Sequence, residues 1–169
     1  MKENPRLAAY EYVGPAEIRQ AVSNRAGSRI TSAADLERFL EERGSDEAAE
    51  PFTFVVDASC FLVLAPRRSE HVACAGAEPV LAAGEVRFSR NDENGRLIAD
   101  YVSNQSTGYC PQAESWAAVV IGLVRAEVEH GTGYTHPIVF RCCPSCHNWN
   151  VVKESVFVCS MCDSDLPLG

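Results

Sequence analysis

The sequence FRCCPSCHNWNVVKESVFVCSMC, residues 140–162, contains two Cys-x2-Cys pairs. The first is Cys143 with Cys146, the second is Cys159 with Cys162, and twelve residues separate them. Pairs with this spacing bring four soft thiolates together around one tetrahedral metal ion. Because cysteine fills all four positions, no coordination site is left for a substrate water. The pattern therefore predicts a structural metal rather than a catalytic one.

Between the two pairs, short β-prone runs at 149–152 and 156–158 flank a polar turn and predict a hairpin. Residues 140–167 thus resemble the zinc ribbon family, and the resemblance implies a structural Zn²⁺ ion. Iron bound as in rubredoxin uses the same four ligands and stays an alternative. Two redox-active pairs are disfavoured, because neither precedes a helix in a βαβ unit. We expect Cys142 to be a buried thiol and His147 a surface residue, although either could replace a neighbouring ligand.

The whole chain of 169 residues, this module included, suffices for one domain with a small appendage. We expect an N-terminal strand–helix–helix segment over 1–50, a β-rich body over 51–136 and the ribbon over 137–169. The fold class is α+β, with a mainly antiparallel sheet, about three helices and the C-terminal zinc ribbon. Apolar periodicity and turn residues predict strands at 10–13, 52–56, 60–64, 84–90, 96–103 and 137–142, and helices from Pro15, from Ser32 to Gly44, and over 112–129.

Charge and composition narrow the partners and the compartment. The net charge is −8, and residues 46–136 hold six basic groups against thirteen acidic ones. No segment has the basic excess that phosphate binding needs, so nucleic acid is disfavoured. The longest apolar run, 116–124, is too short to span a bilayer, and the N-terminus lacks the apolar region of a signal peptide. We expect a cytoplasmic protein, whose eight cysteines serve as thiols or metal ligands. Thirteen arginines against two lysines suggest a GC-rich, bacterial coding genome.

A second set of motifs lies in the middle of the chain. It runs from His71 through Pro79-Val80 to Ala82-Ala83-Gly84-Glu85, and ends with Ser106, Tyr109 and Pro111. Over residues 52–130 the chain resembles a segment of bacterial polymorphic-toxin C-terminal regions and of plant IQ-motif calmodulin-binding proteins. The resemblance implies a setting in conflict or defence between microbes. That pattern has a histidine where this chain has Gly108, so a role for that imidazole does not carry over.

Three residues of these motifs are candidates for catalysis. If the strands meet, His71, Glu85 and Tyr109 form a cluster in which a histidine of near-neutral pKa and a carboxylate transfer protons. The structural alternative is that Gly84 permits close strand packing, Tyr109 bonds a loop carbonyl and Glu85 faces solvent. Cys110 precedes a predicted helix, but no residue is placed to orient a base, which disfavours a cysteine hydrolase.

These observations support three hypotheses. The first is a metal-stabilised bacterial protein that acts as a protein-interaction module, with another protein as its partner, in a toxin or defence system. The second is an enzyme with a His71/Glu85/Tyr109 site that acts on a small molecule or a protein. The third is nucleic-acid binding through the ribbon, which the scarcity of basic residues after 136 disfavours.

Overall fold

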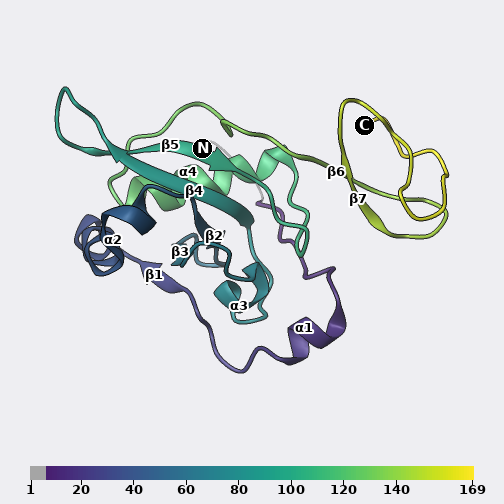
Figure 1. The fold of residues 1–169 in the computed structure, drawn as a ribbon, viewed down its shortest axis with the longest axis horizontal. Coiled ribbons are helices and arrows are strands. Elements are labelled where there is room, and N and C mark those ends of the chain that lie inside the picture. The colour runs from purple at the N-terminus through teal and green to yellow at the C-terminus, as the bar shows by residue number, and fades with distance from the viewer. Residues whose placement is uncertain (1–6) are drawn as a thin grey trace, which may run out of the picture.

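The computed structural model describes residues 7–169, and its centre is a five-stranded sheet (Figure 1). The strand order is β1-β3-β2-β4-β5, and all neighbouring strands are antiparallel. The predicted α+β class with a mainly antiparallel sheet is therefore confirmed. The strands span Ser28–Ile30 (β1), Phe52–Val56 (β2), Leu62–Ala65 (β3), Ala82–Arg90 (β4) and Leu97–Ser103 (β5).

Helices cover both faces of the sheet. Side chains of α2 and α4 join one core with the sheet, and those of α1 and α3 pack into a second core on the other face. The central strands β2 and β3 are buried on both faces, which is why their sequences are almost continuously apolar. The helices span Ala16–Gln20 (α1), Ala33–Ala48 (α2), His71–Ala75 (α3) and Trp116–Arg125 (α4), and a 3₁₀ turn at Ala113–Ser115 (η1) precedes α4.

The sequence signals at α2 are confirmed at its start and modified at its end. The Oγ of Ser32 accepts a hydrogen bond from the Asp35 amide at 3.3 Å, as an N-cap does. Gly44 interrupts the helix with a φ of 76°, in the left-handed region that favours glycine, but one more turn continues to Ala48. Leu36 and Phe39 place α2 in the core, and β1 pairs with β3, so the N-terminal segment shares the sheet and core of the body.

Three local predictions differ from the structure. The helix predicted over 112–129 ends at Arg125, because Glu129 instead exchanges backbone hydrogen bonds with Leu97 and Ala99 of β5. The strand predicted at 10–13 is reduced to one bridge between Tyr10 and Val80. Strand β1 and helix α3 were not predicted, since each has five residues or fewer and β1 has one buried side chain.

The C-terminal hairpin extends from one end of the molecule, away from the sheet (Figure 1). Its strands β6, Val139–Cys142, and β7, Trp149–Val152, are antiparallel. The run at 156–158 forms no strand and makes only isolated bridges, Lys153 with Val156 and Val158 with Asp165. The predicted pairing of 149–152 with 156–158 is therefore wrong: β7 pairs with β6 across the first cysteine pair.

The base of the hairpin is attached to the body. The side chain of Asn104 donates to the Ile138 carbonyl at 2.9 Å and accepts from the Ile138 amide at 2.7 Å. Phe140 is buried, and its carbonyl accepts from the Gln112 side chain. No helix within residues 7–169 has both the length and the apolar character needed to cross a membrane.

Candidate metal centre

The four cysteines of the two pairs meet at the tip of the hairpin. The Sγ atoms of Cys143, Cys146, Cys159 and Cys162 all lie within 4.8 Å of one another. Two of the separations are 3.6 Å, between Cys143 and Cys162, and 3.5 Å, between Cys146 and Cys159. Sulfurs at about 2.3 Å from a tetrahedral ion lie about 3.8 Å apart. The four thiols therefore fit one metal ion, and since zinc and iron accept the same set, the geometry does not select between them.

Both cysteine pairs lie in turns of the same construction, which we call the first knuckle (residues 143–148) and the second knuckle (residues 159–164). In the first, the Cys143 amide donates to the Asn148 carbonyl, and the His147 amide donates back to the Cys143 carbonyl. In the second, Cys159 and Ser164 make the first of these bonds and Asp163 makes the second. His147 and Asp163 both have a φ of 59°, the left-handed conformation that closes each turn.

Donor groups around two of the four sulfurs, those of Cys159 and Cys162, favour the thiolate form that a metal requires. The Met161 amide and the Asn150 side chain both donate to Cys159 Sγ at 3.5 Å. The Met161 amide is the main cause that lowers the pKa of Cys159 to about 6. Hydrogen bonding with Ser164 lowers the pKa of Cys162. Such hydrogen bonds hold the sulfurs in a fixed orientation and stabilise their negative charge.

Asn150 connects the two knuckles and was not singled out from the sequence. Its side-chain amide donates to the Asn148 carbonyl at 2.9 Å, and its Oδ1 accepts from the Ser160 amide and hydroxyl, both at 3.0 Å. Asn150 is 6% exposed, and both polar atoms of its side chain have hydrogen-bond partners inside the ribbon. A polar residue between Trp149 and Val151 in a β-prone run was the only available signal.

The ribbon has almost no hydrophobic core apart from its cysteines. Cys143 and Cys159 are fully buried together with Leu166, and only Val152 and Phe157 pack against them. Cys142 lies outside the four-cysteine group, half-buried, and its thiol donates to the His147 carbonyl at 3.5 Å. His147 is exposed. An ion is thus the main element that can hold the two knuckles together.

The three candidate catalytic residues do not share hydrogen-bond partners in the part of the chain that the structure describes. His71 begins α3, and its Nε2 is 2.9 Å from the Gly84 carbonyl, to which it donates. The Tyr109 hydroxyl donates to the Glu78 carbonyl at 2.8 Å, and Glu85 is half-exposed on β4 opposite Ser103. Within residues 7–169, no hydrogen bond joins these three side chains to one another. A catalytic role for them stays a prediction.

Buried side chains in this region have pKa values that favour their neutral forms. Burial lowers the pKa of His71, and it raises the pKa of Tyr109 and that of Cys110, the latter to about 12. A thiol with such a pKa is almost wholly protonated at neutral pH and is a poor nucleophile. Cys110 therefore suits a packing role.

Comparison with known proteins gives no assignment: no protein-family description, curated protein or solved structure matches this chain.

Proposed function

We propose that the C-terminal ribbon is a zinc-stabilised module through which this protein binds another protein. The observation that carries this proposal is where the exposed large hydrophobic side chains lie. Among residues 7–169 there are eight, and the body contributes only Val13 and Val124. The other six lie on the ribbon: Val139, Trp149, Val156, Val158, Met161 and Leu168.

A metal-bound ribbon suits this use because its apolar side chains are held in place at little entropic cost. Met161, 70% exposed, lies between the two cysteines of the second knuckle, so an ion bound there fixes its backbone. Trp149 is 40% exposed at the start of β7. Tryptophan and methionine are both enriched at protein interfaces. The ribbon also extends away from the body, which leaves these residues accessible to a partner (Figure 1).

Nucleic-acid binding receives less support from the contacts. The ribbon has two cationic side chains, Arg141 and Lys153. The Arg141 guanidinium already donates to the carbonyls of Pro167, Leu168 and Phe140. Lys153 alone would then face phosphates, which is far below the number of cations that phosphate binding uses. The proposed setting in microbial conflict is supported by the resemblance of residues 52–130 alone.

The test of the interaction module compares single substitutions that place a negative charge at an exposed hydrophobic site. Immobilised wild-type protein, Met161→Glu, Trp149→Glu and Val124→Glu are incubated with an extract of the source organism. Val124 is 58% exposed on α4 and serves as the control on the body. We expect the same protein to be retained by the wild type and by Val124→Glu, and to be lost with either ribbon variant. Equal retention by all four forms would rule out the ribbon as the binding surface.

A further inference from the structure

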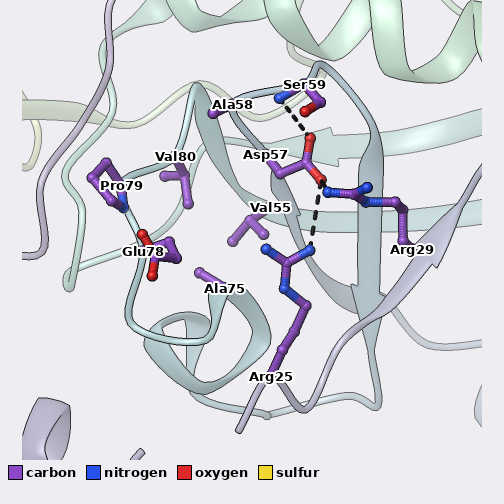
Figure 2. A pocket seen from close by; sticks show the side chains of 10 residues that line it. All are labelled: Arg25, Arg29, Val55, Asp57, Ala58, Ser59, Ala75, Glu78, Pro79 and Val80. Carbon is purple, nitrogen blue, oxygen red and sulfur yellow. Dashed lines mark hydrogen bonds and ion pairs between the residues drawn. The ribbon is translucent and has the colours of Figure 1, made fainter.

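A pocket of about 170 Å³ lies on the α3 face of the sheet, at the end where β2 turns into β3 (Figure 2). Its apolar wall consists of Val55, Ala75, Pro79 and Val80. Arg25 and Arg29 enter from the segment before and within β1, and their guanidinium groups point toward Asp57. The pocket thus combines an apolar wall with two cationic groups. Its residues belong to other elements than the metal centre and are distant from it in the sequence.

Asp57 is 5% exposed; one of its carboxylate oxygens accepts hydrogen bonds, and the other takes part only in ion pairs. Its Oδ1 accepts from the amides of Ser59 and Phe61, at 2.9 and 3.0 Å, and so holds the turn between β2 and β3. Its Oδ2 is 2.5 Å from the Arg29 guanidinium, which also lies over the Phe61 ring. One arginine is therefore fixed in place and neutralised by one buried carboxylate.

Among the described residues, Arg25 has no carboxylate of its own, because Asp57 already pairs with Arg29. Its nearest carboxylate oxygen within residues 7–169 is the same Oδ2, at 3.6 Å, beyond hydrogen-bond distance. Its side chain is 31% exposed, and its Cβ and backbone lie close to Gly76, at the end of α3. A guanidinium held in a pocket without a full partner presents N–H donors that match the geometry of a carboxylate.

We propose that this pocket binds a small molecule that joins a carboxylate to an aliphatic group, with the carboxylate on Arg25 and the aliphatic part against Pro79 and Ala58. Val55, Ala75 and Val80 form the buried floor beneath, since each is at most 2% exposed. The volume limits the ligand to the size of a short branched acid or an aliphatic amino acid. Glu78 also lines the pocket and has no ion pair in the described part of the chain. It supplies a partner for an ammonium group, so an amino acid and a simple carboxylic acid are two sources of the same chemistry.

The test is a titration of ¹⁵N-labelled full-length protein, followed by NMR, with isovalerate, its neutral amide isovaleramide, and leucine. We expect shifts at Ala58, Ala75 and Val80, and at least tenfold weaker binding of the amide than of the acid, because the neutral amide cannot form charge-assisted hydrogen bonds with the Arg25 guanidinium. Tighter binding of leucine than of isovalerate would identify amino acids as the class, and the reverse would identify simple acids. Equal binding of acid and amide, or shifts elsewhere only, would overturn the proposal.

Two variants with opposite expected effects give a second test. Arg25→Gln should weaken isovalerate binding at least tenfold, whereas Arg67→Gln, at an exposed pair with Glu50 outside the pocket, should not change it. Asp57→Asn retains an oxygen for the Ser59 and Phe61 amides but releases Arg29, so binding should become about threefold tighter or more. A thermal melt checks that each variant is folded. Unchanged affinity in folded Arg25→Gln, or weaker affinity in folded Asp57→Asn, would contradict the proposal.

Discussion

Removal of the metal should unfold the ribbon and leave the body folded. The apolar contribution around the two knuckles is small: apart from Phe140 at the base of the hairpin, one buried Leu166 and two partly buried side chains supply about 5 kcal/mol at most. Ordering the backbone costs about 1–2 kcal/mol per residue, which over the two knuckles exceeds that contribution. A structural zinc ion supplies on the order of 10 kcal/mol. Without the ion, the ordered ribbon should therefore be the minor state.

Hydrogen exchange read by mass spectrometry or NMR separates the two parts of the chain. After chelation, or in Cys162→Ser, the amides of Cys143, Cys159 and Leu166 should lose protection by orders of magnitude. Amides of β2 and β4 should keep theirs, because their core does not include the ribbon. The Ile138 amide should also stay protected, since it donates to Asn104 of the body.

The matched control is Cys60→Ser, which removes a half-buried thiol outside the four-cysteine group. It should leave ribbon exchange unchanged. Protection that persists over residues 143–166 in protein shown by elemental analysis to be metal-free would refute the reasoning. So would loss of protection in the sheet to the same extent as in the ribbon.

Four further predictions follow from single contacts. Asn150→Ala strips the Ser160 amide of its acceptor and should weaken metal binding about 10- to 100-fold, as measured by competition with a chromophoric chelator. Gly84→Ala would place a Cβ 1.8 Å from the Ser103 carbonyl oxygen and should cost about 3 kcal/mol or more in urea unfolding; a cost near zero would contradict the strand spacing. At pH 8, alkylation of folded protein should spare Cys74 and Cys110, because burial raises the pKa of each to about 12; rapid labelling of Cys110 would reopen the nucleophile hypothesis. Burial lowers the pKa of His71 in the folded protein, so the stability that the neutral imidazole contributes is present above the ordinary histidine pKa of 6.5 and is lost as the pH falls below 6.5. His71→Gln should therefore flatten the pH dependence of the free energy of unfolding in that window, and an unchanged profile would disprove this account.

The sequence was informative where the decisive contacts are local. The cysteine spacing predicted which four thiols lie together, the Ser32 cap marked the start of α2, and the apolar runs located β2 and β3. In each case the signal and the structure it predicts lie within a few residues, so spacing alone carries the information.

What the sequence could not show depends on residues far apart in the chain. Val128 and Glu129 continue a helical pattern, yet the chain there pairs with β5, because tertiary hydrogen bonding overrides local propensity. Arg25 and Asp57 meet only after β1 and the β2–β3 turn have been placed. Asn150 gains its role only when the second knuckle folds back onto β7.

The most direct measurement of the central claim is X-ray absorption spectroscopy of the purified protein at the zinc edge, together with elemental analysis. We expect one zinc ion per chain with four sulfur neighbours at about 2.3 Å. Less than stoichiometric metal in folded protein, or a shell that includes nitrogen or oxygen ligands, would contradict a site composed of Cys143, Cys146, Cys159 and Cys162.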